Sequence, residues 1–536
     1  MDYKTTIERI QAIEKAMDVT AIRYKGLHLW PLVRMQLWQR LLHPDKYAPP
    51  AAIGLKRLAN KLSEGFFRPD FYAPYLEHAK RHRSNLSELS EFGPVDILLY
   101  SREKDHEDQI GGRYYNRHID PMIDLIKTRY TFLKLELITD RTDKTLPRFE
   151  HTHFFDSLDY LRCDAQRSVI AAFQESPNIP AIEQGRTLTQ LLAGTRFDLA
   201  LTEEYLMMES ERVLHYIRYF KEMLTATRPK AVFFVNYYDN IGMALITACK
   251  SLGITTVDLQ SNRQGKHHGM YSSWNSVPEG GYEMLPDVLW CWGKKSVENI
   301  KESQPENKQQ QRAVIGGNAW LAKWIDRDPA GFVLDEETSS FIDKVNAYQK
   351  VILVTLQKSD LKIPKSVIEA MRKAPTDWYW LIRLHPDQRA KVLTVEASLT
   401  ENHIDNADVV QSTRLPLYLL LRTCHRHLTR RSSVALEGLR FNVPSVIFDA
   451  SGATLYKEYI DQGHFAFAKN AEQIIDALYE PMGSLVEDPP YVETSRMYAT
   501  DALSDIMSNA KRSVLPQKRV IKPVIAAHVT KKPALV

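Results

Sequence analysis

The sequence predicts an α/β protein made of two successive doubly wound domains, each a parallel sheet with helices on both faces. Short apolar runs alternate with helical stretches over most of the chain, which is the βαβ pattern of parallel sheets. The alternation stops at Glu302–Arg312, a polar stretch rich in Gln, Lys and Asn, and then begins again. The 536 residues also exceed what a single core normally organises.

Residues 1–92 are expected to form a helical extension, because their apolar positions recur at helical spacing. Within it, the segment from Leu27 to Trp38 combines aromatic, apolar and basic residues, and Pro31 suits a first helical turn. Two interpretations are open: an amphipathic surface that touches lipid, or a helix packed on the next domain. We favour packing, since Trp and Leu stripes usually face a core.

The first α/β domain is expected over residues 93–305. Its strands are predicted, in chain order, at Val95–Tyr100, Phe132–Ile138, Phe197–Leu201, Ala231–Val235 and Ile254–Leu259. Two long helices are predicted between them, at Tyr205–Thr227 and Asn240–Leu252. In a parallel sheet the carboxyl ends of such strands meet at one edge, where ligands bind.

The second α/β domain is expected over residues 306–485. Its strands are predicted at Val351–Leu356, Trp378–Arg383, Asp408–Gln411, His427–Thr429 and Ser445–Phe448. Its helices are predicted at Ser366–Lys373, Pro416–Arg422, Val434–Phe441 and Ala471–Tyr479. Residues 486–536 should hold one more helix, near Val492–Lys511, and a mobile basic tail. Two such domains joined by a short linker enclose a cleft, which is a preferred ligand site.

Composition narrows the class of protein. The net charge is only +4, from 70 basic and 66 acidic side chains, so a nucleic-acid partner is not expected. The four cysteines are widely and irregularly spaced, which argues against disulfides and thiolate zinc sites and fits a reducing cytoplasm. No apolar signal core or membrane span is evident. We therefore expect a cytoplasmic protein whose contact with the inner membrane, where its substrate requires one, is peripheral.

Two motifs in the C-terminal third carry the chemistry. In the first, His385 and Pro386 follow the apolar strand that ends near Leu384. In the second, Ser432 and Ser433 follow an apolar strand and open a helix, a position where hydroxyls cap free N–H groups and phosphates bind. The distance between the motifs allows one further βαβ turn, which is expected to place both at neighbouring C-terminal strand ends of one sheet. They are therefore predicted to converge on one ligand.

Glu437 lies one helical turn after Ser433 and can accept hydrogen bonds from ribose hydroxyls. The alternative is a capped helix with a solvated glutamate. Gln357, at the end of the second domain's first strand, faces the same predicted cleft. Gly317 follows a short strand and permits either a close approach to a ligand or a turn.

The His-Pro and Ser-Ser motifs resemble the nucleotide-binding half of GT-B glycosyltransferases, which contain two Rossmann-like domains. More narrowly, they resemble bacterial sialyltransferases, polysialyltransferases and capsular Kdo transferases that use CMP-sugars, and CDP-glycerol glycerophosphotransferases. The resemblance implies that His385, with Pro386, contacts the donor phosphate, that Ser432 and Ser433 hold it, and that Glu437 binds the ribose. It covers roughly residues 93–480.

The matching segments of the first domain include Arg113–Arg117 with Asp120-Pro121, Asn236–Tyr238 and Ala248–Ile254, and they resemble surface-polysaccharide biosynthesis proteins. The domain departs from these relatives at one position. They commonly carry Gln-His-Gly where this chain has Gln260, Ser261 and Asn262, so the histidine expected as general base is replaced by a serine. A serine alone is no base at neutral pH. The acceptor side is expected near these three residues and His268. Substitutes for the base are Glu203, Glu204, Asp239, His267 and His268.

No metal and no cofactor are expected. The Asp326-Arg327-Asp328 triplet matches a metal-binding pattern but falls at a predicted helix-to-loop junction, and no Walker loop or complete GxGxxG occurs. The sequence thus indicates a metal-independent glycosyltransferase that moves a sugar from a nucleotide donor, preferably CMP-linked, to a surface-polysaccharide or lipid-linked glycan. The alternatives are a CDP-glycerol or CDP-ribitol type polyol-phosphate transferase, a sugar-nucleotide 2-epimerase, and a catalytically silent subunit that binds nucleotide or glycan.

Overall fold

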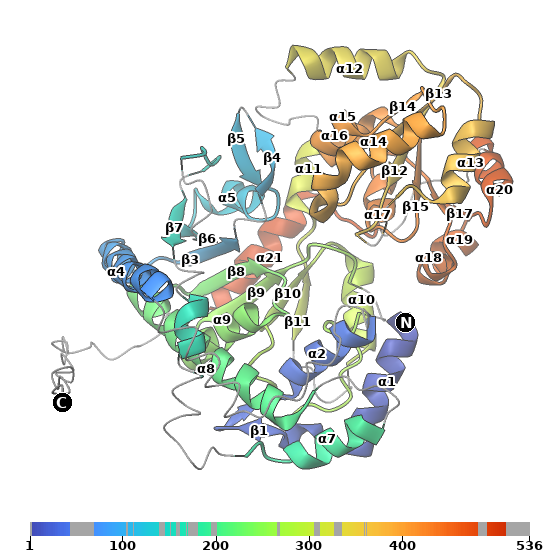
Figure 1. Cartoon of the computed structure of the whole chain (residues 1–536). Coiled ribbons are helices and arrows are strands. Elements are labelled where there is room, and N and C mark those ends of the chain that lie inside the picture. Colours follow the sequence, from blue (N-terminus) through green and yellow to red (C-terminus); the bar gives the residue numbers. More distant parts are fainter. Residues whose placement is uncertain are drawn as a thin grey trace, which may run out of the picture.

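The computed structural model has two lobes, each built on a parallel sheet (Figure 1). It describes residues 3–42, 69–102, 106–110, 112–138, 145–150, 152–156, 161–167, 169, 181–194, 201–264, 268–304, 311–325, 335–358, 360, 362–480 and 490–510. The predicted α/β class, with two Rossmann-like domains facing a cleft as in GT-B proteins, is confirmed by this topology.

The first lobe contains a seven-stranded sheet in the order β11-β10-β9-β8-β3-β6-β7, with every neighbouring pair parallel. Its strands are β3 (Ile97–Arg102), β6 (Phe132–Ile138), β7 (His153–Asp156), β8 (Ala231–Val235), β9 (Thr255–Leu259), β10 (Val288–Cys291) and β11 (Arg312–Ile315). The chain runs outward from β3 to β7 and then from β8 to β11. The order therefore reverses between β3 and β8.

Helices cover both faces of this sheet. They are α5 (Asp120–Ile126), α7 (Gly185–Gly194), α8 (Glu203–Thr227), α9 (Asn240–Ser251) and α10 (Lys294–Glu302). One face packs on α8 and α9 in a large apolar core, and the other packs on α5. A small hairpin, β4 (His106–Ile110) and β5 (Arg113–Asn116), precedes α5 and contributes Tyr115 to a core shared with the second lobe.

The second lobe contains a six-stranded sheet in the order β14-β13-β12-β15-β16-β17, again parallel throughout. Its strands are β12 (Lys350–Thr355), β13 (Trp378–Arg383), β14 (Ala407–Asp408), β15 (Arg426–Thr429), β16 (Ser445–Ile447) and β17 (Phe465–Phe467). The order reverses between β12 and β15, so a ligand crevice is expected at the carboxyl ends of these two strands.

The helices of the second lobe alternate with its strands and pack on both faces. They are α11 (Ala319–Ile325), α12 (Glu336–Asn346), α13 (Lys365–Lys373), η4 (Pro386–Lys391), α14 (Val392–Glu401), α15 (Val410–Arg414), α16 (Leu417–Thr423), α17 (Val434–Leu439), α18 (Ala450–Leu455), α19 (Lys457–Asp461) and α20 (Ala471–Tyr479).

The N-terminal extension packs against the first lobe. It comprises α1 (Tyr3–Ala16), η1 (Val19–Ala21), the hairpin of β1 (Arg23–Tyr24) and β2 (Leu27–His28), α2 (Trp30–Leu42) and α4 (Pro69–Glu91). The hairpin is a departure from the all-helical expectation. Almost every residue of α2 is buried, and Arg34 within it bonds the carbonyl of Gly269. The packing interpretation of this segment is therefore confirmed.

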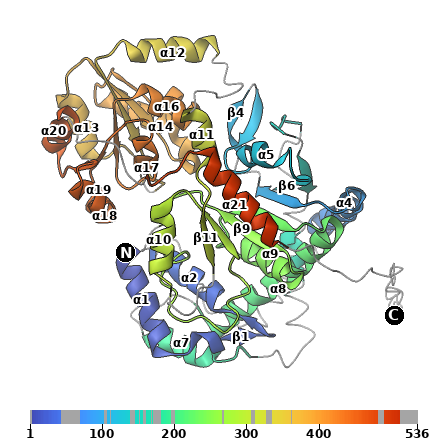
Figure 2. The ribbon, with the colours of Figure 1, turned by 180° about the vertical axis from the view of Figure 1, so that it is seen from behind.

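The chain crosses between the lobes twice within the described residues. The first crossing follows β11, which pairs with β10, so the first sheet continues past residue 305, where the sequence analysis ended the first domain. The second crossing returns the chain to the first lobe, where α21 (Arg496–Asn509) packs on the same face as α5 (Figure 2). The two crossings touch, because the Asn318 N–H donates to the Glu493 carbonyl at 2.9 Å.

Most predicted elements occur within one or two residues of their expected bounds. The strand expected at Asp408–Gln411 is shorter, because α15 begins at Val410. Most of the strand expected at Phe197–Leu201 lies outside the described residues. Across the described part of the chain, no helix combines the length and apolarity that a bilayer crossing requires.

Candidate functional site

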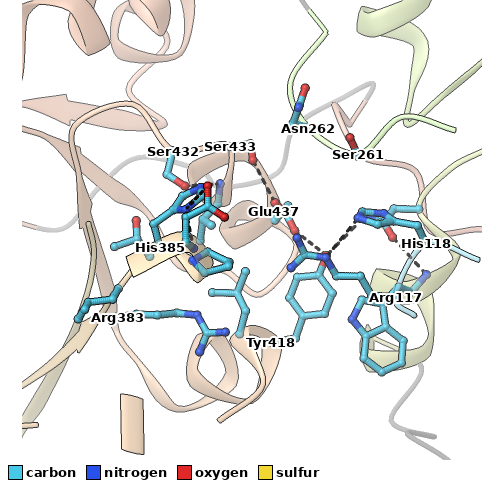
Figure 3. A pocket seen from close by; sticks show the side chains of 18 of the residues that line it. Arg117, His118, Ser261, Asn262, Arg383, His385, Tyr418, Ser432, Ser433 and Glu437 are labelled. Atoms are coloured by element: carbon cyan, nitrogen blue, oxygen red, sulfur yellow. Dashed lines mark hydrogen bonds and ion pairs between the residues drawn. The ribbon is translucent and has the colours of Figure 1, made fainter. Parts of the chain in front are cut away.

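A pocket of about 590 Å³ lies between the lobes, at the point where the second sheet reverses its strand order (Figure 3). We call two parts of its lining the second wall and the first wall. The second wall, from the second lobe, includes Thr355, Leu356, Arg383, His385, Pro386, Asp387, Arg389, Tyr418, Ser432, Ser433 and Glu437. The first wall includes Arg117, His118, Asn236, Ser261, Asn262 and Trp292, with Asn318 and Trp320 from the crossing and α11.

His385 stands at the end of β13, where it caps η4. Its Nδ1 accepts a hydrogen bond from the Asp387 backbone N–H at 3.2 Å, and Pro386 starts the 3₁₀ turn. Because Nδ1 is the acceptor, Nε2 carries the proton of the neutral ring. The side chain is 39% exposed and lines the pocket, and its contact with a donor phosphate stays a prediction.

Ser432 and Ser433 lie on the loop that joins β15 to α17. The Tyr456 hydroxyl donates to the Ser432 carbonyl at 2.7 Å, and this bond holds the backbone of the loop. Gly452 passes so close to the Arg430 carbonyl that a Cβ atom would lie 1.8 Å from that oxygen. These contacts hold the loop at the pocket, which both serines line. Ser432 Oγ accepts the Val434 N–H at 3.4 Å, and the Ser433 hydroxyl lies beside Glu437.

Glu437 lines the pocket but is itself 7% exposed. The Tyr418 hydroxyl donates to Oε2 at 2.5 Å, and the Ser433 hydroxyl lies 3.5 Å from Oε1. Burial raises the pKa of this carboxyl, while the bonds from Tyr418 and the nearby Arg117 guanidinium partly oppose the shift. The alternative of a solvated glutamate is therefore wrong, because the carboxyl is buried and bonded on both oxygens. The predicted role of Glu437 in binding ribose stays a prediction.

The floor of the pocket is a buried polar chain across three strands. Thr355 Oγ1 lies 2.8 Å from His427 Nε2 and 3.0 Å from the Thr429 hydroxyl, and His427 Nδ1 lies 2.8 Å from the Ser445 hydroxyl. Desolvation lowers the pKa of His427 to about 3, so this ring is neutral. Each polar side-chain atom of these four residues has a hydrogen-bond partner, so the group forms a rigid base for the second wall.

On the first wall, Arg117 and His118 occupy the loop between β5 and α5. The Asn116 side-chain oxygen accepts the backbone N–H groups of His118 and Ile119 at 3.0 and 3.1 Å. Asp120 Oδ2 in turn accepts the Asn116 backbone N–H at 2.7 Å. These hydrogen bonds between nearby residues hold the loop in place, and the side chains of Arg117 and His118 line the pocket.

Ser261 and Asn262 reach the pocket just after β9. The Ser261 hydroxyl donates to the Asn236 side-chain oxygen at 2.9 Å, and Asn236 itself adopts a left-handed backbone with φ of +60°. Gln260 points away from the pocket, because its amide bonds the Trp292 N–H and the Asn262 carbonyl inside the lobe. Of the three predicted residues, the last two line the pocket.

Several predicted residues lie elsewhere. Asp239 caps α9 and pairs with Arg102 at 3.0 Å, and Glu203 accepts the Ile182 N–H at 3.2 Å at the start of α8, next to the exposed Glu204. Both glutamates occupy a first helical turn, where negative charge is stabilised. These three acids are not among the pocket residues.

His268 is also away from the pocket lining. Its ring lies among Trp38, Tyr238 and Tyr271, with centroid distances of 4.8 to 5.4 Å, and desolvation lowers its pKa to about 4. Aromatic packing on a neutral imidazole accounts for this position.

Two predicted donor residues serve the backbone instead. Gln357 bonds Asp360 through its N–H at 2.8 Å and is not in the pocket lining, which contains its neighbour Leu356. Gly317, at φ +73°, accepts the Trp290 indole N–H at 3.0 Å and touches the main cleft only through an adjoining cavity. His267, a predicted site residue, lies outside the described residues, as does the Asp326-Arg327-Asp328 triplet, which was not expected to bind a metal.

Sequence reasoning did not select Arg117, His118, Asn236, Arg383 or Tyr418 as site residues. The Arg383 guanidinium is 8% exposed and bonds the carbonyls of Ser412, at 2.9 Å, and Leu415. The pattern Asn116-Arg117-His118 followed by Asp120-Pro121 is the available clue, since an Asx turn before a proline-started helix marks an ordered loop. Among the described residues, no three His, Cys, Asp or Glu side chains gather as a metal would require.

No protein-family model matches this chain, and no curated protein matches it in sequence. Similar solved structures include UDP-GlcNAc 2-epimerase from Neisseria meningitidis bound to UDP-GlcNAc, at 14% identity and TM-score 0.45, covering 77% of this chain and 99% of that one. The UDP-GlcNAc 2-epimerase of Methanocaldococcus jannaschii is 12% identical with a TM-score of 0.45, and the match covers 77% of this chain and 99% of that one. The kitacinnamycin glycotransferase is 11% identical with a TM-score of 0.38, and the match covers 77% of this chain and 95% of that one. Likeness at this level does not extend to activity or substrate.

Proposed function

We propose that the protein is a metal-independent glycosyltransferase that uses a nucleotide-activated sugar, with CMP-linked donors preferred. One observation carries the proposal: polar side chains of both lobes line a single pocket at the switch point of the second sheet. A pocket at that place in a doubly wound sheet suits a nucleotide, and a second lobe across from it supplies room for an acceptor.

The second wall is suited to the donor phosphate. His385 presents an imidazole donor, Ser432 and Ser433 present hydroxyls, and Arg389 adds a cation at the same rim. Donors placed where charge develops on a leaving phosphate stabilise the transition state without a reorganisation cost. The resemblance of these motifs to those of CMP-sugar transferases favours a nucleoside monophosphate as the leaving group.

The first wall is suited to the acceptor. Arg117, Asn236 and Ser261 line this wall with polar groups, whereas its two tryptophans, Trp292 and Trp320, are only 3% and 4% exposed. Such polar side chains can bond the hydroxyls of a glycan. We therefore place the acceptor, a surface-polysaccharide or lipid-linked glycan, on this wall. With a lipid-linked acceptor, the protein would work in the cytoplasm at the inner membrane surface.

A thermal-shift panel tests the nucleotide. CMP, CDP, UDP and GDP, with CMP-sialic acid, CMP-Kdo and UDP-N-acetylglucosamine, are added one at a time to the full chain. A ligand present at 100 times its Kd stabilises the folded state by about 2.7 kcal/mol, which raises Tm measurably. We expect the largest rise with CMP compounds. Rises confined to UDP compounds would contradict the donor preference, and no rise with any of them would contradict the proposal.

Product analysis then separates the enzymes. Release of CMP that requires a glycan acceptor, with a new glycosidic linkage in the product, is the expected outcome. A product that contains phosphorus identifies a polyol-phosphate transferase instead, and a donor altered at C2 without an acceptor identifies an epimerase. Nucleotide binding with no turnover of any donor would identify a silent subunit.

His385→Ala tests the second wall directly. We expect turnover to fall by about 100- to 10,000-fold, the range for loss of a group that acts on a charge or proton in the transition state. Tm should stay near that of the wild type, because the ring is half exposed. His403→Asn is the control, since His403 is exposed after α14 and its φ of +55° suits asparagine. Equal kinetics in both variants would contradict the role of His385.

A further inference from the structure

We propose that His118 is the general base that deprotonates the acceptor hydroxyl, in the role that relatives give to the residue at the position of Ser261. This inference rests on the proposed glycosyl transfer and names a residue for one of its steps. It follows from the position of the His118 ring, from the loop that holds it and from the bond it makes to Arg117.

The position of His118 is right for a base. It lies on the first wall, on the acceptor side, while His385 and the two serines lie on the opposite wall (Figure 3). Figure 3 also shows Arg117 between His118 and the group formed by Glu437 and Tyr418. An acceptor hydroxyl held between the walls would therefore meet an imidazole on one side and the donor on the other.

The loop that carries His118 is built on a buried ion pair. Asp120, which accepts the Asn116 N–H, also pairs with Lys134 of β6 through Oδ1 at 2.5 Å, and both side chains are 0% exposed. Glu136, two residues further on β6, is also 0% exposed and pairs with Arg148 at 3.2 Å. Separating a buried ion pair would leave an uncompensated charge away from water. A loop attached to such a pair is therefore held in one place. Such anchoring gives a catalytic side chain a fixed orientation.

The protonation state of His118 also fits. Arg117 Nε lies 3.3 Å from His118 Nε2, and a guanidinium can only donate, so Nε2 is the unprotonated nitrogen of a neutral ring. Burial and the adjacent Arg117 charge lower the pKa of His118 well below its ordinary value. The other ionisable groups that line the pocket are His385, Asp387, Arg389, Arg383, Tyr418 and Glu437. At neutral pH the imidazole is therefore uncharged, and the lone pair of Nε2 is the site at which a proton would bind.

Other bases expected from sequence are less well placed. Ser261 is itself a hydroxyl and donates to Asn236. Asp239 is committed to Arg102 and to the start of α9, and His268 is enclosed by aromatic rings. Among the described first-wall residues, His118 alone combines a basic nitrogen with a place in the pocket lining.

The proposed step transfers one proton and exchanges one bond for another at the anomeric carbon of the donor. Nε2 of His118 takes the proton of the acceptor hydroxyl while its oxygen forms a bond to the anomeric carbon of the donor. The bond from that carbon to the phosphate oxygen breaks, and the electron pair leaves with the phosphate. The Arg117 guanidinium, displaced from Nε2 by the acceptor hydroxyl, turns to the phosphate. The imidazolium then releases its proton to water.

Two histidine variants test the inference, with CMP-sialic acid, CMP-Kdo and UDP-N-acetylglucosamine as donors and glycan acceptors from the turnover assay. His118→Ala is expected to lower kcat by about 100- to 10,000-fold. The Tm shift given by CMP should be retained, because CMP binds the opposite wall. Added imidazole should restore turnover of His118→Ala in proportion to its free-base concentration. His403→Asn should behave as the wild type with and without imidazole.

The outcomes separate the two proposals. If the wild type transfers sugar and His118→Ala keeps kcat within a few-fold, the inference is wrong and the proposed function stands. If kcat falls but imidazole restores nothing and the CMP shift is lost, His118 only shapes the pocket, and the inference is again wrong. If the wild type transfers no sugar from any donor, the proposed function fails and the inference fails with it.

Discussion

His385, Ser432 and Ser433 of the second wall lie just beyond strand ends, whereas the Arg117–His118 part of the first wall is a loop held by a buried ion pair. The two strands that these residues follow, β13 and β15, are not the neighbours that the sequence predicted, because β12 lies between them, but the parallel sheet still sets their separation. His118 lies two residues after β5 ends at Asn116 and two residues before α5 begins at Asp120. Its loop is held by the bonds of Asn116 and Asp120 and by the ion pair of Asp120 with Lys134. The same pocket is thus assembled by hydrogen-bonded strands on one side and by charge pairing on the other.

This difference predicts how each wall fails. A sheet distributes its stability over many backbone bonds, so one side-chain change on the second wall should leave the strands in place. The first-wall loop depends on a few buried polar contacts, so losing one partner leaves an uncompensated charge in an apolar surrounding. Substitutions behind the first wall should therefore cost more than those on the second.

The largest effect is expected from Lys134→Met. It leaves the Asp120 carboxyl buried beside an apolar chain, which should lower the free energy of unfolding by about 3–5 kcal/mol and reduce turnover as the loop loses its anchor. Lys127→Met is the matched control, because Lys127 is 49% exposed in its pair with Asp124 and such pairs contribute about 1 kcal/mol or less. Urea denaturation measures both. Equal losses would remove the contrast between the walls.

A smaller effect is expected from Tyr418→Phe on the second wall. The change removes the hydroxyl that donates to Glu437 at 2.5 Å, which should cost about 1–3 kcal/mol in the free energy of unfolding. Tyr479→Phe, at a 53% exposed tyrosine, should stay within about 0.5 kcal/mol of the wild type. A loss for Tyr418→Phe that exceeds the loss for Lys134→Met would reverse the proposed ranking.

Glu437→Gln probes the same bond through pH. Burial raises the pKa of Glu437 in the folded state above its ordinary value of 4.5, so the native protein holds this proton more tightly than the unfolded chain. The stability contributed by that proton is complete below pH 4.5 and is lost as pH rises through the folded-state pKa. We expect the variant, relative to the wild type, to gain stability as pH rises from 4 to 8 in urea titrations. A difference independent of pH would contradict the raised pKa.

The smallest effect is expected from Ser261→Ala. It removes the 2.9 Å bond to the side-chain oxygen of Asn236, at a cost of about 0.5–1.5 kcal/mol in urea denaturation. Turnover should fall far less than in His118→Ala, since a serine at this position supplies no base. A turnover loss in Ser261→Ala as large as that of the histidine variant would assign the proton transfer to the serine after all.

The second wall was largely predictable from sequence because its strands are continuous apolar runs that end at polar residues or proline. β13 ends at Arg383, as predicted, and Ser433 immediately precedes α17. The roles of His385 and Glu437 stay predictions, but their place in one pocket follows from strand order. The buried state of Glu437 could not be foreseen, because Tyr418 approaches it from a different helix.

The first wall was less predictable because its contacts join residues that no local pattern connects. Lys134 and Glu136 alternate with leucines, a pattern that normally puts charges in solvent, yet both are buried by partners elsewhere in the chain. Glu203 and Glu204 follow an expected strand end and were predicted to face the cleft, but they lie in the first turn of helix α8. Sequence pattern locates strands, whereas loop conformation depends on long-range charge pairing.

The return of α21 to the first lobe has a consequence for synthesis on the ribosome. The apolar face that α21 covers together with α5 stays open until residues 496–509 have emerged. By then the entire second sheet has already been made, so that lobe can fold as an insertion within an unfinished one. This apolar face stays exposed while the roughly 180 residues between β11 and α21 are translated, and exposed apolar surface of this kind is prone to aggregation.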